Sequence, residues 1–417
     1  MSKLKRLGIG AGITLVVLGA LTGVWYKQHY ILPPLVEAKV APPNPNGFDT
    51  LQKAFELTVE KREGIEVSPT PLPGNDSALR YPMQPLAGRL KLAQANAASI
   101  AKTREALAQE YLIPAHISPE IEGGPFRNQA RMLVFAGDAY TDTGNLPEAA
   151  RCDLDAIELG VMVPRGGGVL PVIFGTATET LGATALNGLV DKLDARTARA
   201  AADRLAKIEQ KRSPLPDNLH QESLEISHRV TKLLTNSPLT AWKNIEKEFG
   251  ADASTAQLLP FQVAMTYEGP GPTIAALDHG INRVAEQSKL PWGPQRPSTK
   301  EPSRNPLVEL IGSGAGRTEF PYRRMCTLLA LLQTRLRLRA IFLETGGYPT
   351  NLESLPEDPF SPTRSPLGYR SDGKTFTLWS VGPDARDDNG KPIDTKNRNW
   401  QSQDGYKPGD VVAGINT

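Results

Sequence analysis

The chain has 417 residues, of which 40% are hydrophobic and 22% are charged, and its formal net charge is +2. This length is enough for two or three domains with a substantial core. Acidic and basic residues are interspersed, which argues against the concentrated basic face of a nucleic-acid-binding protein, so we expect no nucleic-acid partner. Two cysteines, Cys152 and Cys326, are too few for a disulfide scaffold or a structural zinc site, and they are either two buried thiols or one long-range disulfide.

The N-terminus has the pattern of a membrane anchor. Residues 1–6 contain three basic side chains, and residues 7–26 form an uncharged run that ends in Trp25 and Tyr26. A helix of this length spans about 30 Å, the thickness of a bilayer core, and aromatic rings favour its interface. We predict a cytoplasmic leader (1–6) and a transmembrane helix (7–26) that contacts inner-membrane lipid and acts as a signal anchor. The rest of this single-pass chain is then periplasmic; a cleaved signal peptide is the alternative.

A proline-rich stretch and a long helical region follow the anchor. Residues 27–48 are predicted to form a semi-rigid stalk because prolines favour an extended backbone. From residue 49 to residue 289 the apolar residues recur mostly with helical spacing, interrupted by a turn-rich segment at 66–85. We expect this stretch to be an α-helical domain. The prolines of the stalk are Pro33, Pro34, Pro42, Pro43 and Pro45.

The clearest internal pattern in this region predicts a helix hairpin between residues 126 and 160. Small residues let two helices approach closely, Gly144 can adopt the left-handed turn, and Pro147 suits a first helical turn. The spacing resembles a single tetratricopeptide-like unit, except that Asp153 stands where that family has an aromatic residue. No second copy follows at the repeat period, so an array is not expected. The residues that carry the resemblance are Gly137, Tyr140, Gly144, Ala149 and Ala156.

The chain lacks the common catalytic and nucleotide-binding motifs. It has no H-E-x-x-H or G-x-S-x-G, and the glycine-rich run at 165–168 lacks the lysine of a phosphate-binding loop. We therefore predict no catalytic or cofactor-binding residues, and an enzyme is the less favoured interpretation. Glu179 is the single charge in an apolar stretch, and it is either a functional carboxylate or a paired residue on a packed helix.

Residues 290–322 are rich in proline and glycine and are expected to be a linker. A helix is predicted at 323–344, where apolar residues recur on one side and Gly346 and Gly347 follow. The chain then reads GGYPTNLESL, DPF and PLGYR, followed by an alternating strand at 374–382 and the acidic loop PDARDDNG.

The order of these C-terminal motifs resembles the globular domain of type II secretion major pseudopilins. The resemblance implies a small α+β domain at 323–417. Two departures matter: the anchor lacks a prepilin processing site, and the helix at 323–344 does not continue a membrane helix. We expect a folded unit in a membrane protein of secretion or envelope type, and not a filament subunit.

The same resemblance implies a calcium site in the acidic loop. Ser380 and Val381 would supply backbone or hydroxyl oxygens, and Asp384, Asp387 and Asp388 would supply carboxylates. Hard oxygen ligands on a flexible loop are the donors that Ca²⁺ prefers. The alternative is an ordinary acidic turn in contact with solvent.

Together these patterns predict a mainly α protein with an N-terminal transmembrane helix, an α-helical hairpin-containing domain and a small C-terminal α+β domain. The leading interpretation of function is a membrane-anchored interaction or scaffold protein with an envelope or secretion partner. A second is an envelope hydrolase whose site draws on Asp153, Asp155 and Glu179. A third is a calcium-stabilised structural module without a partner of its own.

Overall fold

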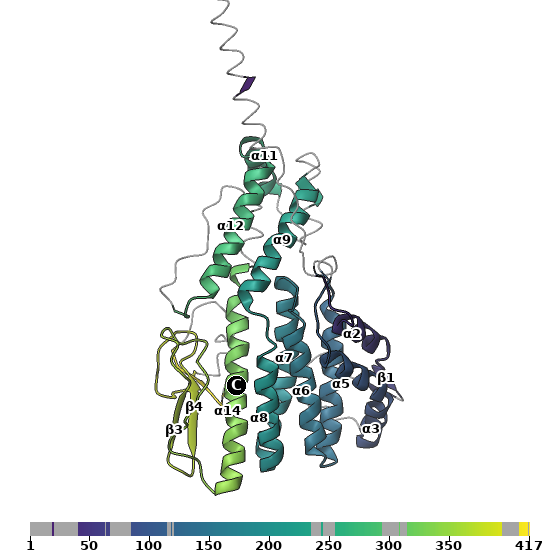
Figure 1. The fold of residues 1–417 in the computed structure, drawn as a ribbon, viewed down its shortest axis with the longest axis vertical. Helices are drawn as coiled ribbons and strands as arrows, with labels where there is room; N and C mark the ends of the chain where they lie inside the picture. Colours follow the sequence, from purple (N-terminus) through teal and green to yellow (C-terminus); the bar gives the residue numbers. More distant parts are fainter. Residues whose placement is uncertain are drawn as a thin grey trace, which may run out of the picture. The chain divides into compact units, whose positions relative to one another are not determined.

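A computed structural model gives the fold, which is mainly helical with a small sheet (Figure 1). The predicted leader and anchor lie outside the described residues, apart from Gly19 and Ala20, which are helical. The structure describes residues 19–20, 41–62, 64–66, 85–114, 118, 121–234, 243–244, 255–293, 308, 315–393, 408–415 and 417.

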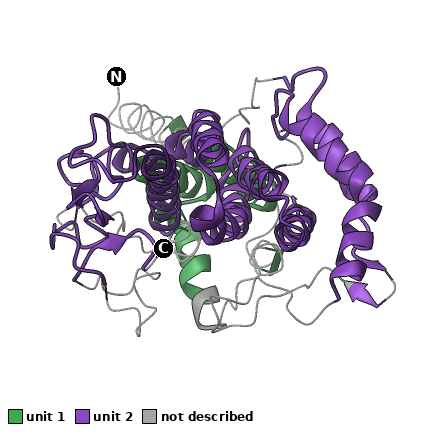
Figure 2. Cartoon of the chain, turned by 90° about the horizontal axis from the view of Figure 1, so that it is seen from below, with its two compact units in different colours: residues 1–38, 222–284, 298–316 green, residues 39–221, 285–297, 317–417 purple. Residues whose placement is uncertain are grey.

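The chain divides into two compact units, each formed from separate stretches of sequence (Figure 2). Unit 1 comprises residues 1–38, 222–284 and 298–316, and unit 2 comprises 39–221, 285–297 and 317–417. This division differs from the linear order of domains that the motifs suggest. The predicted helical stretch 49–289 is shared between both units, and the predicted C-terminal module belongs to the same unit as residues 39–221.

The helical body of unit 2 consists of helices that lie side by side (Figure 1). The neighbouring pairs include α5 with α6, α6 with α7, and α14 with both α7 and α8, while α2 packs on α4. A short antiparallel pair, β1 (Lys61–Arg62) and β2 (Ile65–Glu66), lies beside α3. The helices are α2 (Gly47–Glu56), α3 (Leu86–Ala95), α4 (Ala97–Leu107), α5 (Gly123–Asp142), α6 (Leu146–Met162), α7 (Val169–Leu189), the 3₁₀ helix η2 (Val190–Lys192), α8 (Ala195–Glu209), the first residues of α9 (Leu215–Leu234) and α14 (Glu319–Thr345).

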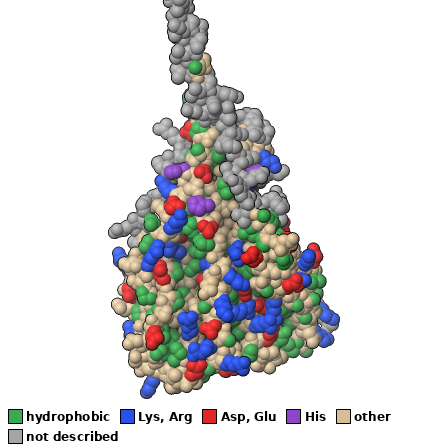
Figure 3. Space-filling model, in the orientation of Figure 1, with side chains coloured by type: hydrophobic (Ala, Val, Ile, Leu, Met, Phe, Trp, Pro, Cys, Tyr) green, Lys and Arg blue, Asp and Glu red, His purple; other side chains and the backbone are tan. Residues whose placement is uncertain are grey.

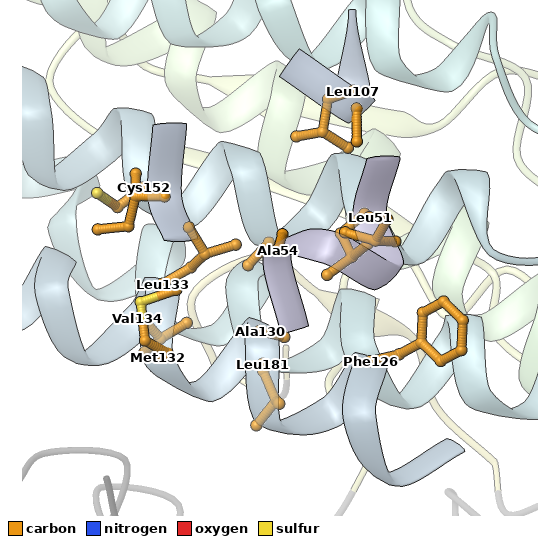
Figure 4. Close-up of a cluster of buried hydrophobic side chains, with 14 of the residues drawn as sticks. Leu51, Ala54, Leu107, Phe126, Ala130, Met132, Leu133, Val134, Cys152 and Leu181 are labelled. Carbon is orange, nitrogen blue, oxygen red and sulfur yellow. The ribbon is translucent and has the colours of Figure 1, made fainter. Parts of the chain in front are cut away.

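The predicted helix hairpin is present as α5 and α6. Gly144 has a φ of +79° in the turn between them, a backbone conformation that glycine adopts readily. Asn145 caps α6 by accepting a hydrogen bond from the backbone N–H of Glu148 (3.4 Å). Side chains from α2, α4, α5, α6 and α7 close one core around this hairpin (Figure 4).

The helix α7 is packed in the interior of unit 2 against α5 and α6. Together with η2 it forms the stretch Val169–Lys192, which by length and composition alone could cross a membrane. However, 56% of its most apolar window is buried inside the protein. In the described part of the chain this stretch is the single one that meets the criterion, and its burial is that of a core helix.

The helix α14 is buried on two faces. Leu329 and Leu336 join a core with α7 and α8, and Leu331 and Leu338 join a second core with the C-terminal sheet. That sheet is antiparallel in the order β3 (Gly368–Ser371), β4 (Phe376–Ser380) and β5 (Val411–Val412). The predicted helix and strand are therefore present. The helix α14, however, packs on one face against α7 and α8 and on the other against the sheet. It therefore belongs to two cores and does not border a separate domain, because both of its apolar faces need partners.

Part of the predicted linker 290–322 is built into unit 2. Trp292 is 7% exposed, packs on Phe320 and Phe360, and donates a hydrogen bond from Nε1 to the carbonyl of Pro383 (2.8 Å). The guanidinium of Arg323 donates to two carbonyls in the preceding segment, those of Ser288 and Leu290. These contacts tie the segment to the C-terminal module.

The described residues of unit 1 are mostly helical. They include the later part of α9, α11 (Thr255–Tyr267) and most of α12 (Pro270–Ser288). The hydroxyl of Ser223 on α9 donates to the carboxylate of Asp278 on α12, which also accepts from Asn282.

Candidate functional site

The residues implied for calcium lie at the end of β4 and in the loop after it. Ser380 and Val381 are held by a single carboxylate, that of Asp358. The Ser380 hydroxyl donates to Oδ1 of Asp358 (2.6 Å), and the Val381 backbone N–H donates to Oδ2 (2.8 Å). Asp358 is buried, so this carboxylate organises the start of the loop from inside the protein.

The loop aspartates mainly bind their own loop. Asp384 Oδ1 accepts from the backbone N–H of Arg386 (3.2 Å). Asp387 Oδ1 accepts from Trp379 Nε1 (2.9 Å) and from the backbone N–H of Asn389 (2.9 Å). Such side-chain to backbone bonds are typical of structural aspartate turns.

A second buried carboxylate, Asp410, closes the loop from the other side. It accepts from the backbone N–H groups of Asp388 (3.2 Å) and Gly390 (2.6 Å). Burial, helped by the charges of Asp387 and Asp388, outweighs the lowering effect of these two N–H bonds and raises the pKa of Asp410 to about 6. Sequence reasoning missed both Asp358 and Asp410, because their role depends on contacts 20 or more residues away.

In the described part of the chain, no group of three or more His, Cys, Asp or Glu side chains is placed to hold a metal ion. The calcium site stays a prediction from the resemblance. Cys152 on α6 and Cys326 on α14 are free thiols.

Two of the three carboxylates considered for hydrolysis are held in ion pairs. Glu179 on α7 is fully buried and forms a two-pronged pair with Arg212, with oxygen to nitrogen distances of 3.1 and 2.6 Å. The guanidinium of Arg212 also lies over the Tyr322 ring, 5.7 Å from its centroid. Asp155 on α6 is held by Arg104 (2.6 Å) and Arg204 (2.5 Å). Both carboxylates are therefore engaged in salt bridges with arginine side chains.

The third carboxylate, Asp153, faces the close contact between α5 and α6. It is 2% exposed, and a Cβ added at Gly137 would lie 2.8 Å from its Oδ1. Burial raises the pKa of Asp153 well above its usual range, and the charges of Asp138 and Asp155 raise it further. Asp153 is not among the residues that line the groove described next.

Unit 2 contains an open groove of about 760 Å³. We call it the charged groove; α4, α6, α8 and the turn after α8 supply its lining. The lining is Arg104, Leu107, Ala108, Pro147, Ala150, Arg151, Leu154, Asp155, Glu158, Asp194, Arg196, Thr197, Ala200, Ala201, Arg204 and Lys211. Acidic and basic side chains are mixed over the face of the protein drawn in Figure 3, whereas in the charged groove they form an ordered series.

The series is a ladder of alternating charges along α6. Glu148, Asp155 and Glu158 project from one side of the helix, since spacings of three, four and seven residues share a face. The carboxylate of Glu148 pairs with Arg104 (2.7 Å), and Glu158 pairs with Arg204 (2.7 Å) and Lys211 (2.5 Å). Asp155 lies between them and shares both arginines.

The ladder holds three helices together and shapes the groove. Burial by itself lowers the pKa of Arg104, but Asp155 and Glu148 outweigh it and the pKa is raised, so the guanidinium stays charged. Burial also lowers the pKa of Arg204, but Asp155 and Glu158 outweigh it, so the pKa of this arginine is raised too. The sequence offered one signal for this site: carboxylates at helical spacing on α6.

No family model, curated protein or solved structure matches this chain.

Proposed function

We propose that this protein is a non-enzymatic, membrane-anchored interaction protein that docks a partner of a secretion or envelope assembly in the charged groove. The observation that carries the proposal is the groove itself. It is about 760 Å³ in volume, and its walls are fixed by ion pairs between α4, α6 and α8. A preformed concave surface of this size is typical of a binding site.

An envelope hydrolase is less well supported by the same geometry. Glu179 and Asp155 are each neutralised by arginine, and Asp153 is buried at a helix contact. A catalytic acid or base needs a carboxylate that reaches the substrate in a cleft. Asp155 lines the charged groove, but both of its oxygens are held by arginines, and Asp153 and Glu179 do not line the groove.

The pseudopilin-like end fits an interaction protein better than a filament subunit. Both apolar faces of α14 are covered, one by α7 and α8 and the other by the sheet. A pilin-type helix needs an apolar face for its neighbours in a filament. The proposed N-terminal anchor would hold this body at the membrane surface.

The proposal is tested by recovering partners of the full chain from native membranes after mild cross-linking. Ala200 is exposed and lines the groove, so Ala200→Trp would obstruct it whatever the charge of the partner. Ala98→Trp, at an exposed position of α4 that does not line the groove, is the matched control. We expect Ala200→Trp to lose a partner that the wild type and the control retain. Recovery of the same partners with both variants would contradict the proposal.

A calcium-stabilised C-terminal module is a second proposal, favoured by the repulsion among the loop carboxylates. The pKa of Asp384 is raised by burial and also by the charge of Asp388, and Asp410 is raised in the same way. A bound cation would relieve this repulsion. We expect millimolar calcium to raise the thermal unfolding midpoint of the full chain in detergent, relative to chelator, and Asp388→Ala to abolish the rise. An unchanged midpoint would leave the loop as an acidic turn.

A further inference from the structure

We infer that the charged groove takes an acidic peptide segment of a partner protein. This inference rests on the proposed function, because it names the chemistry of the segment that docks there. It is carried by the hydrogen-bonding state of the groove: both oxygens of Asp155 and of Glu158 are occupied, and Asp194 caps α8 by accepting from the backbone N–H of Thr197 (2.7 Å), while some of the groove's donors are not occupied.

The acceptors of the ladder are fully engaged. Asp155 directs one oxygen to Arg104 and the other to Arg204. Glu158 directs one oxygen to Lys211 and the other to Arg204. A ligand that brings cations or hydrogen-bond donors to these carboxylates would have to displace an existing partner.

The groove has more hydrogen-bond donors than its own carboxylates engage. The guanidinium of Arg196 makes no hydrogen bond or ion pair with any described residue, although its charge helps to lower the pKa of the nearby Asp194, and the guanidinium of Arg151 pairs only with Glu148, at 3.6 Å, among the described residues. Both side chains are exposed and line the groove. Guanidinium groups of this kind bind carboxylates through charge-assisted hydrogen bonds. The groove therefore accepts a ligand that supplies negative charge.

The length of the ladder favours a chain over a compact anion. Glu148 and Glu158 are ten residues apart on α6, which is about 15 Å at the rise of an α-helix. The cations paired with them are spread over the same distance. An extended peptide advances about 3.3 Å per residue, so four or five residues match this length. A single phosphate would contact one end alone.

The floor of the groove is apolar. Leu107, Leu154 and Ala201 line it and are at most 5% exposed. A highly charged, uniformly polar ligand would leave this floor uncovered. A segment that combines acidic and small apolar side chains would cover the floor and pair with Arg151 and Arg196.

The test uses the full chain in detergent and a fluorescein-labelled 12-residue peptide of repeated Glu-Ala-Glu-Leu, followed by fluorescence polarisation. The control peptide has Gln in place of every Glu. We expect binding of the acidic peptide that weakens with salt, and at least tenfold weaker binding of the control. The double variant Arg151→Glu, Arg196→Glu should lose at least tenfold in affinity. Arg127→Glu, which changes an exposed arginine of α5 outside the groove, should bind as the wild type does.

Two further arms separate other anions from a peptide. The inference would be overturned if 10 mM inorganic phosphate displaced the peptide at constant ionic strength. It would also be overturned if vesicles with anionic lipid bound through the same two arginines more strongly than the peptide does. Equal binding of the acidic and Gln peptides, or no binding of either, would also overturn it. The proposed function fails separately, when Ala200→Trp keeps every partner. If Ala200→Trp loses a partner that the double arginine variant retains, the proposal that a partner docks in the groove stands. The inference that the docked segment is acidic is then rejected.

Discussion

Asp153 shows how one buried carboxyl makes the stability of the helix hairpin depend on pH. It lies against the α5–α6 contact, where the tetratricopeptide-like pattern has an aromatic residue, and burial raises its pKa well above the usual range. The unfolded chain loses this proton near pH 4, whereas the folded chain keeps it. The folded state therefore binds more protons, and stability falls as pH rises from about 4 towards the folded pKa.

We expect Asp153→Asn to stabilise the protein at pH 8 and to have a much smaller effect at pH 4, because an amide does not ionise. A tenfold change in a protonation equilibrium is worth about 1.4 kcal/mol, so the gain at pH 8 should be of at least this order. Urea unfolding followed by circular dichroism at both pH values measures it. Asp203→Asn, at an exposed position on α8, is the control and should show no such difference. Equal effects of Asp153→Asn at the two pH values would contradict the prediction.

The ion-pair partners of Glu179 and Asp155 were beyond sequence reasoning. Glu179 meets Arg212 at a separation of 33 residues, and Asp155 meets Arg104 at a separation of 51. No local spacing encodes such pairs, because they are set by the packing of α4, α6 and α7. The sequence did signal that Glu179 is unusual, and it left open whether the residue is functional or paired. The structure places it in a buried pair.

At the level of elements, the α6–α7 contact depends on glycines whose role the sequence did not reveal. The predicted hairpin ends at residue 160, whereas α6 continues through Gly160 to Met162. A Cβ at Gly160 would lie 2.6 Å from the backbone nitrogen of Glu179 and 2.7 Å from the carbonyl oxygen of Gly175. The two backbones thus approach too closely for any side chain at this position.

Gly160→Ala is therefore expected to destabilise the protein by about 1–3 kcal/mol, the usual range for an overpacked core. This cost opposes the gain of up to about 1 kcal/mol that alanine brings to a helix interior. Gly188→Ala, also in a helix but with nothing within 4 Å of its added Cβ, should stabilise it slightly. Thermal unfolding of the two variants checks the opposite signs. A stabilised Gly160→Ala protein would show that α6 and α7 are farther apart than described.

At the scale of the whole molecule, helices and strands were more predictable than the way they assemble. The helix predicted at 323–344 is α14, and Gly346 ends it in the left-handed conformation with φ of +80°. Helical periodicity and a terminal glycine are local signals, so the sequence carries them. The division into units depends on which apolar faces meet across the chain. A proline-rich stretch between two motifs does not show that the motifs fold apart.

The shared position of α14 predicts that residues 317–417 do not fold alone. Without residues 39–221, the face of α14 that carries Leu329 and Leu336 would lose its partners on α7 and α8 and meet water. Burying a leucine is worth about 1.5–3 kcal/mol, so several exposed apolar side chains exceed what a three-stranded sheet can offset. We expect the isolated fragment to give a poorly dispersed amide NMR spectrum, and residues 39–417 to give a dispersed one. A dispersed spectrum with cooperative unfolding from 317–417 alone would show that the C-terminal module is an independent domain and that its contact with α7 and α8 is secondary.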